Sequence, residues 1–584
     1  MTPLRLTVIC AALALLVVTG PAQADHGSAD EASPNMLHVA NLPPPPQFLV
    51  GPANETRVNS DLAFHRAGKT HSRFHNLLAQ GNYDGFRLVD ISDPSNPVQV
   101  VAFECRGNQG DLSFYEAKDR LLLIQSIDTP QTSSDCATAR DQPVAPGIHP
   151  ITGLPGNFFV PGFEGLRIFD VTNPEAPVHI ASVPTACGSH THTTIPDERD
   201  QQGVVYVSSY PIGASVTPSD SDFGGPRCIP PHAKISIVII PDDSPETPIV
   251  KEQPLHADTL PYRGTLGSGG TGAVGCHDIT AYYETQSANP AQNAQRGNPK
   301  FHVAGAACLE EGQLWDITDP ENPTTLGAHS HIRNPFITLP SRGLWHTASF
   351  SNDGEVVLFT DEWEGAGLRG GCQGPQDTRG NVWFYKNVPP GTEPVPVYGR
   401  YMIPRVQPTT ELCTLHNGNV ITVADESDGD FGVSSSYQAG STVFDFTGVQ
   451  NLPEIVLPPT LPAPVPPLVA REVAFFDAKN DCRQGPPVGP STRCIDDTWS
   501  TYWYNDFIYA SSGREQAGRP GNRGLDVYML VGRNGRLVDR NTGLPTVTTP
   551  QEAARPNVKQ FTGRKVRYMN PQTQDTFHDT SHGR

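Results

Sequence analysis

The sequence predicts an all-β fold, a seven-bladed β-propeller of four-stranded antiparallel blades whose ring is closed by an N-terminal strand. A short unit of two strands joined by a turn recurs seven times along the chain. The 54 glycines and 58 prolines among the 584 residues fall between short apolar runs, where they mark turns. Because a four-stranded sheet cannot bury both of its faces alone, the repeats must stack against one another.

The first 24 residues have the pattern of a secretory signal peptide. Arg5 precedes an apolar run from Leu6 to Val18, and Ala22-Gln23-Ala24 forms a small-residue cleavage pattern before Asp25. A membrane anchor is the alternative, but the run is too short to cross a bilayer and is followed by polar, Pro-rich sequence. We therefore expect a secreted or periplasmic protein with no membrane span.

Residues 25–59 are expected to form an N-terminal extension that contains a spare strand. This strand is NMLHVANL, which begins at Asn35. The seventh blade lacks an obvious outer strand of its own, so the spare strand can pair there. A closed ring is favoured over an open solenoid for that reason.

Residues 60–530 hold the seven repeats. In the three clearest copies, a strand ending in Asp is followed by a turn in which Asp or Asn precedes Pro, and a second Pro leads into another strand. The clearest copies begin at Gly85, Gly165 and Gly312, and looser copies begin at Ala233, Asn381, Ser441 and Gly524. Two further strands precede each copy, which gives four strands per blade. Residues 531–584 form a C-terminal tail outside the repeat pattern.

Four longer strings carry a resemblance to a known family. They are GCHDIT from Gly275, LWHTASFSNDGEVVLFTDEW from Leu344, CTLHNGNVI from Cys413 and STYWYNDFIYASS from Ser500. With the repeats, they resemble the LVIVD-repeat family of secreted bacterial proteins over residues 60–530. The resemblance implies a propeller fold and a secreted location, and it brings no established reaction.

Long inserts are predicted on one face of the ring, between the second and third strands of five blades. They run from about 127 to 163, 210 to 232, 364 to 380, 427 to 440 and 511 to 522. Long loops on one rim of a rigid scaffold are where binding sites are usually built. We therefore expect a small molecule, a polysaccharide or a protein to bind at this insert-bearing face.

The ten cysteines beyond the leader predict a disulfide framework, as is usual in exported proteins. Ligation of a metal by thiolates is the alternative, but no CxxC spacing is present. Taken in sequence order, the cysteines would staple blade connections and inserts on the same rim as Cys105–Cys136, Cys187–Cys228, Cys276–Cys308, Cys372–Cys413 and Cys482–Cys494.

Histidines begin the inner strands of four successive blades. These candidate metal ligands are His190, His277, His346 and His416, together with His192, two residues beyond the first. Asp61 and Asp111 are expected at the same position in blades one and two. Inner strands of a propeller begin at its axis, so these side chains should converge at one mouth of the ring. Imidazoles with carboxylates suit a divalent transition metal such as zinc, copper, iron or manganese.

Carboxylates recur where second strands return to the same mouth. Asp361, Glu362 and Asp425 are the candidate catalytic residues, available for proton transfer or for orienting the imidazoles. The alternative is that these polar groups hydrogen-bond neighbouring blades and only hold the ring closed.

Two classes of function remain open. One is a metal-dependent enzyme of unknown reaction, whose layout is similar, by analogy only, to His-lined propeller oxidases and oxygenases. The other is a non-catalytic extracellular binding or adhesion module. The net charge of −20 argues against nucleic acid as a partner. The sequence contains no nucleophile elbow, phosphate loop, dinucleotide fingerprint or zinc-protease helix.

Overall fold

A computed structural model of the chain describes residues 30–569 with gaps, of which the longest span 212–227, 256–274, 285–301 and 479–497. The predicted signal peptide, residues 1–24, lies outside the described residues. No helix in the part of the chain that the structure describes is long and apolar enough to cross a membrane.

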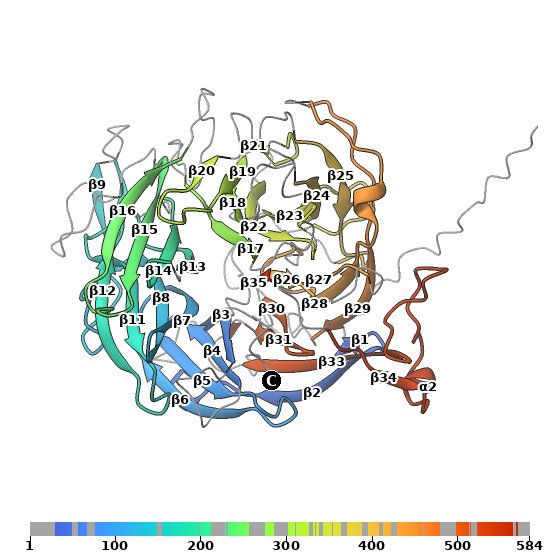
Figure 1. Ribbon diagram of the computed structural model, residues 1–584, viewed down its shortest axis with the longest axis horizontal. Coiled ribbons are helices and arrows are strands. Elements are labelled where there is room, and N and C mark those ends of the chain that lie inside the picture. The colour runs from blue at the N-terminus through green and yellow to red at the C-terminus, as the bar shows by residue number, and fades with distance from the viewer. Residues whose placement is uncertain are drawn as a thin grey trace, which may run out of the picture.

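Seven antiparallel sheets follow one another around a central axis, as the sequence predicts (Figure 1). From the axis outward, blade one contains β3 (Arg57–Arg66), β4 (Asn76–Asn82), β5 (Gly85–Asp90) and β6 (Val98–Glu104). Blade two contains β7 (Gln109–Ala117), β8 (Arg120–Gln131), β11 (Phe163–Asp170) and β12 (Val178–Pro184). Blade three contains β13 (Thr191–Asp197), β14 (Gln202–Ser208), β15 (Lys234–Pro241) and β16 (Ile249–Pro254).

The remaining blades keep the same order. Blade four contains β17 (Asp278–Glu284), β18 (His302–Cys308), β19 (Glu311–Asp316) and the short β20 (Thr324–Thr325), with β21 (His331–Ile332) also on β19. Blade five contains β22 (Gly343–Phe350), β23 (Val356–Trp363), β24 (Val382–Lys386) and β25 (Val397–Tyr401). Blade six contains β26 (Gly418–Val420), β27 (Phe431–Ser435), β28 (Ser441–Asp445) and β29 (Arg471–Asp477).

Blade seven is completed by the N-terminal extension. It contains β30 (Thr498–Tyr504), β31 (Phe507–Ser512) and β33 (Leu525–Arg533), and its outer strand is β2 (Met36–Leu42). β2 pairs with β33 from Met36 opposite Leu530 to Leu42 opposite Leu525. The two strands lie side by side at the bottom of Figure 1. The predicted closure of the ring by NMLHVANL is therefore confirmed.

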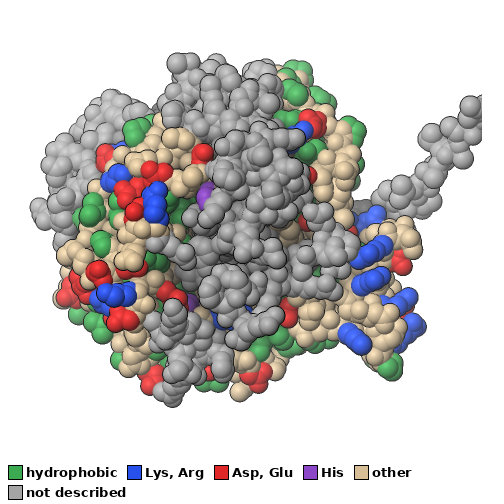
Figure 2. All heavy atoms as spheres, in the orientation of Figure 1, with side chains coloured by type: hydrophobic (Ala, Val, Ile, Leu, Met, Phe, Trp, Pro, Cys, Tyr) green, Lys and Arg blue, Asp and Glu red, His purple; other side chains and the backbone are tan. Residues whose placement is uncertain are grey.

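Short strands at both ends of the chain add to the blades. β1 (Glu31–Ala32) pairs with β29 of blade six, so the extension spans two blades. In the tail, β34 (Val558–Gln560) pairs with β33, and β35 (Tyr568–Met569) pairs with β17. Near β34 lies the single-turn helix α2 (Pro550–Ala553). Lys and Arg side chains gather over this part of an otherwise acidic protein, at the right of Figure 2.

The aspartate that ends the third strand of each clear repeat has a structural role. Asp90 Oδ1 accepts a hydrogen bond from the backbone N–H of Ser92 at 2.9 Å, and Asp170 Oδ1 accepts one from Thr172 at 2.9 Å. Asp316 Oδ1 accepts one from Thr318 at 2.8 Å. A carboxylate that binds the N–H two residues on stabilises a turn, which explains why the repeat signal is so regular.

Four of the five predicted inserts lie between the second and third strands, in blades two, three, five and seven. The insert of blade two contains a hairpin of β9 (Val144–Ile148) and β10 (Pro155–Phe159). The prediction for residues 427–440 is wrong, because β27 occupies Phe431–Ser435 and is itself the second strand of blade six. Its sequence, FGVSS, is small and fully buried and therefore lacks the alternation that marks a half-exposed strand.

Four of the predicted disulfides are present in the described part of the chain: Cys105–Cys136, Cys187–Cys228, Cys276–Cys308 and Cys372–Cys413. The fifth predicted pair, Cys482–Cys494, lies outside the described residues. Disulfides persist in oxidising compartments, so these bridges support an extracytoplasmic location.

Deleting residues 25–45 should lower the stability of the whole ring, because blade seven would lose β2 and expose the unpaired edge of β33. Thermal unfolding should shift to a lower temperature in one cooperative transition. Deleting residues 25–29 alone removes none of the described strands and should leave the melting temperature unchanged. An unchanged melting temperature for the longer deletion would contradict the closure.

Reduction should loosen the rim before it unfolds the ring. The described disulfides fix connections and inserts. Each disulfide-closed loop adds on the order of 2–4 kcal/mol to the free energy of unfolding. Limited proteolysis after mild reduction should cut the inserts while far-ultraviolet circular dichroism still reports native strands. Mass mapping of a non-reduced digest should also recover Cys482–Cys494; free thiols there would refute the fifth pair.

Candidate metal centre at the axial mouth

Three of the four inner-strand histidines occupy the same backbone position. The N–H of His190 donates to Ser208 O at 2.8 Å, that of His277 to Ala307 O at 2.7 Å, and that of His416 to Ser435 O at 2.9 Å. Each bond ties the start of an inner strand to the end of the second strand in the same blade. His346 lies within β22, at a register shift between Trp345 and Ala348. The four residues therefore reach the mouth from four successive blades.

Disulfides hold the segments that lead into these histidines. Cys276 directly precedes His277, whereas Cys187 and Cys413 stand three residues before His190 and His416. The segment before His346 is held instead by the N–H of Trp345, which donates to Leu309 O of blade four at 2.6 Å. Fixed backbones of this kind limit how far the imidazoles can move, which favours a preorganised site.

The four imidazoles form a continuous arc. The ring centroids of His190 and His277 are 4.3 Å apart, those of His277 and His346 are 3.9 Å apart, and those of His346 and His416 are 4.1 Å apart. The ring of Tyr437 continues the arc 4.5 Å from His416. The sequence prediction that these histidines meet at one mouth agrees with this arrangement.

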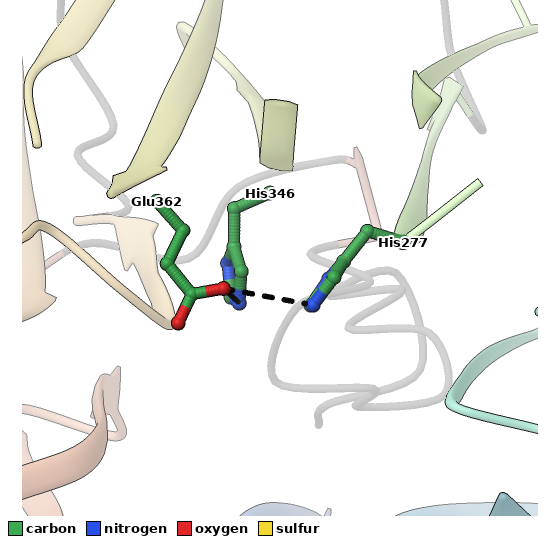
Figure 3. Close-up of side chains that lie close together, drawn as sticks. All are labelled: His277, His346 and Glu362. Carbon is green, nitrogen blue, oxygen red and sulfur yellow. Dashed lines mark ion pairs between the residues drawn. The ribbon is translucent and has the colours of Figure 1, made fainter. Parts of the chain in front are cut away.

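Glu362 lies within the arc, pointing toward His346 and His277 (Figure 3). Its Oε2 is 3.5 Å from His346 Nε2 and 3.8 Å from His277 Nε2. Its Oε1 is 3.8 Å from His416 Nε2 and accepts a hydrogen bond of 2.6 Å from the hydroxyl of Tyr437. The carboxylate is thus held by Tyr437 and faces three imidazoles.

The imidazoles at the centre of the arc are buried and neutral. Burial, followed by the charges of the neighbouring histidines, holds the pKa values of His277 and His346 well below the usual 6.5. Burial also lowers the pKa of His416 to about 3. Metal ligands must be deprotonated, so these rings meet the first requirement of a metal site at neutral pH.

Within the described part of the chain, His346 makes none of the hydrogen bonds expected of a structural histidine. No described group hydrogen-bonds either of its buried ring nitrogens, and the same holds for the buried Nδ1 of His277. An unpaired buried polar atom costs roughly 1–3 kcal/mol. A metal ion bound through Nε2 would compensate part of that cost.

The spacing of the donor atoms fits a metal ion. Ligand atoms of His277, His346 and Glu362 all lie within 4.8 Å of one another. Ligands about 2.0–2.2 Å from a tetrahedral zinc ion stand roughly 3.4 Å apart. The separations of 3.5 Å from His346 Nε2 and 3.8 Å from His277 Nε2 to Glu362 Oε2 need only small adjustments to reach that value. Two histidines and one carboxylate are a donor set that zinc and iron both accept.

The outer members of the arc have partners of their own. His190 Nδ1 is 3.0 Å from Asp128 Oδ2, and its Nε2 is 3.1 Å from Gln109 Nε2. His416 Nδ1 donates to Trp499 O, which turns Nε2 toward Glu362. His416 is therefore positioned to approach the centre, whereas His190 is held at its margin.

The other predicted site residues lie elsewhere. Both ring nitrogens of His192 are within hydrogen-bonding distance of serine hydroxyls of blade two, Ser126 and Ser113, each at 2.7 Å, and its side chain is fully buried. Asp361 precedes Glu362 in β23 and so faces the opposite side of the sheet, where its Oδ2 accepts from the N–H of Gly380 at 3.2 Å. Asp425 lies outside the described residues.

The sequence predicted that Asp61 and Asp111 occupy the same strand position as the histidines, and this prediction is wrong. They correspond to Asp278, which follows His277: Asp61 and Asp278 each accept from the next N–H along the chain at 2.8 Å. These three aspartates therefore form a second tier, in which Asp61 and Asp111 are buried and Asp278 is partly buried. Burial, then the charge of Asp111, raises the pKa of Asp61 to about 7, and burial likewise raises the pKa of Asp111 to about 7.

Stability should consequently fall as the pH rises. The folded state keeps Asp61 and Asp111 protonated up to about pH 7, whereas the unfolded chain releases these protons near the ordinary value of 3.8. Between about pH 4 and pH 7, the window that the unfolded and folded pKa values set, the free energy of unfolding should drop by roughly 1.4 kcal/mol per pH unit for each titrating group. Thermal melts across this range measure the effect. Asp61→Asn should flatten the dependence, and Asp119→Asn on the surface should not; a flat wild-type profile would refute the buried tier as its source.

Comparisons with known proteins add no functional argument. No family model matches the sequence, and no curated protein does. Among solved structures, the periplasmic gluconolactonase of Pseudomonas aeruginosa matches with 9% identity and a TM-score of 0.37, over 88% of this chain and 96% of that chain. A protein from Lactobacillus plantarum matches with 11% identity and a TM-score of 0.38, over 88% of this chain and 99% of that chain. A functionally unknown protein from Desulfotomaculum acetoxidans matches with 10% identity and a TM-score of 0.33, over 71% of this chain and 88% of that chain.

At such low TM-scores these likenesses carry no conclusion about this chain. The fold rests on its own strand pairing, and the site rests on its own geometry. The resemblance to the LVIVD-repeat family stays a prediction.

Sequence reasoning missed Tyr437, Asp128 and Gln109. Tyr437 follows β27, the second strand of blade six, and Asp128 lies near the end of β8; both are in segments that the sequence showed only as inserts. Gln109 begins β7 with a positive φ of 75°. Only Asp128 had a usable signal, because it stands at the end of a second strand, as Glu362 does.

Proposed function

We propose that the axial mouth binds one divalent transition metal through His277, His346 and Glu362, and that the protein is a metal-dependent enzyme. The observation that carries the proposal is His346: its two buried ring nitrogens have no hydrogen-bond partner among the described residues, and its Nε2 is 3.5 Å from the buried carboxylate of Glu362. A histidine that served only to hold the ring closed would be hydrogen-bonded, as His192 is.

The donor set favours catalysis over purely structural binding. Structural zinc sites are closed by four protein ligands, whereas catalytic sites use three and keep a position open. A bound metal would supply Lewis acidity or an activated water at that position. Tyr437 fixes Glu362 through its hydroxyl, and His416 presents Nε2 to the other carboxylate oxygen. These two residues orient the carboxylate.

The margin of the site suits substrate binding. His190 is held by Asp128 and Gln109 beside His277, and the hydroxyl of Tyr210 lies 3.4 Å from His190 Nε2. Tyr210 belongs to the connection between β14 and β15, one of the predicted inserts. We propose that a small molecule or part of a polysaccharide approaches from this insert-bearing face. The predicted signal peptide and the disulfides support export, and the repeat strings support membership of the LVIVD-repeat family.

Replacing His346 by Ala should remove most of the bound metal while the fold persists, since no described group forms a hydrogen bond with its imidazole nitrogens. Elemental analysis of the purified mature protein, grown with several transition metals, gives the stoichiometry and the metal. His179→Ala, on the outer strand of blade two, is the matched control and should keep full occupancy. Circular dichroism checks that both variants fold.

Two outcomes would contradict the proposal. Full metal occupancy in His346→Ala would refute this ligand set. Absence of stoichiometric metal in the wild type, even from metal-replete medium, would favour the non-catalytic binding or adhesion module. Glu362→Gln keeps the shape and the Tyr437 contact but removes the charge, and should weaken metal affinity by at least the roughly 10–100-fold that is typical of losing a supporting residue.

A further inference from the structure

Two acidic side chains lie together where the insert of blade two begins. Asp128 is near the end of β8, and Glu164 is the second residue of the adjacent strand β11. The register between these strands shifts between Phe163 and Gly165, so Glu164 lies opposite the segment that contains Asp128. Both flank Gly188, whose φ is +67°: a Cβ there would be 3.1 Å from Asp128 Cα and 3.1 Å from Glu164 Cβ.

Each of these carboxylates has one buried oxygen that no described group hydrogen-bonds. Asp128 is 6% exposed and Glu164 is 8% exposed. The two oxygens are Asp128 Oδ1 and Glu164 Oε2, whereas Asp128 Oδ2 is 3.0 Å from His190 Nδ1. Burial, and then the charge of Asp128, raises the pKa of Glu164 well above its ordinary value. Two buried like charges are costly unless a cation compensates them.

Blade one shows how the same position is neutralised elsewhere in the ring. The backbone oxygen of Asp84 accepts a hydrogen bond from the N–H of Cys105 at 2.8 Å, and that of Glu164 accepts one from the N–H of Thr185 at 3.3 Å. Asp84 and Glu164 therefore occupy equivalent positions in blades one and two. Asp84 forms an ion pair of 2.5 Å with Arg106, the residue after Cys105. The residue after Thr185 is Ala186. Among the described residues, no Lys or Arg forms an ion pair with Glu164.

We propose that Asp128 and Glu164 bind a hard divalent cation of the calcium type in place of the missing arginine. Ca²⁺ takes six to eight oxygen ligands, from carboxylates, backbone carbonyls and water. Two carboxylates supply its charge, and backbone oxygens and water complete the shell. Extracellular proteins commonly bind Ca²⁺ with dissociation constants near 10⁻⁴–10⁻³ M, in the range available to an exported protein.

This cation has two consequences for the structure. It joins β8 to β11 at the base of the insert that contains β9 and β10, so it stabilises the rim of blade two. It also fixes Asp128, whose other oxygen holds His190 at the edge of the axial arc. The oxygen-only donors distinguish this site from the imidazole-rich centre around His346, which selects transition metals.

The test uses the full mature chain, stripped with a chelator and titrated with Ca²⁺ from about 0.1 to 10 mM. Thermal melts and isothermal titration calorimetry should show a saturable stabilisation with one Ca²⁺ per chain. Glu164→Gln should weaken Ca²⁺ binding at least about tenfold and remove the stabilisation. Asp84→Asn, at the corresponding position of blade one, should retain the Ca²⁺ response even if it lowers the starting stability.

Further variants separate this site from the axial centre. His346→Ala should bind Ca²⁺ as the wild type does, and Glu164→Gln should keep its transition metal. Asp128→Asn provides a second test and should also lose the Ca²⁺ response. The proposal is overturned if Glu164→Gln responds to Ca²⁺ like the wild type. It is equally overturned if the stripped wild type shows no response and Glu164→Gln is simply more stable, because the pair then shares a proton and holds no cation.

Discussion

Antiparallel pairing of β2 with β33 is the interaction on which the rest of the structure depends. It joins a strand near residue 40 to one near residue 530, and the described ring is thereby closed. Only in a closed ring do the inner strands of blades three to six surround a common axis. His190 and His416, separated by more than two hundred residues, therefore belong to one arc because the chain ends meet in blade seven.

The architecture could be predicted because its causes are local. The aspartate that caps each turn, as Asp90 and Asp170 do, leaves a repeated signature in the sequence. The ring-closing strand could be found because blade seven lacked an outer strand and the extension offered one. Strands without such signatures escaped prediction: β27 is built of small buried residues, and β34 and β35 contain only three and two residues.

The site was less predictable because it depends on the direction of individual side chains. Asp361 and Glu362 are adjacent, and the pleat of β23 sends only Glu362 to the axis. An offset of one residue likewise moves Asp61 and Asp111 out of the histidine arc and into a buried tier with Asp278. Tyr437 reaches the site through a connection whose course no sequence period encodes.

Hydrogen bonding separates the buried polar groups of the mouth into two kinds. Asp61 is bonded to Asn417 and Leu62, and His192 is bonded to two serines, so the protein itself satisfies them. His346 and Glu164 retain buried atoms that no described group satisfies. His346 lies among imidazole nitrogens and one carboxylate, whereas Glu164 lies beside the carboxylate of Asp128. Since borderline metals prefer imidazole and calcium prefers oxygen, the two places should select different ions and respond to different chelators.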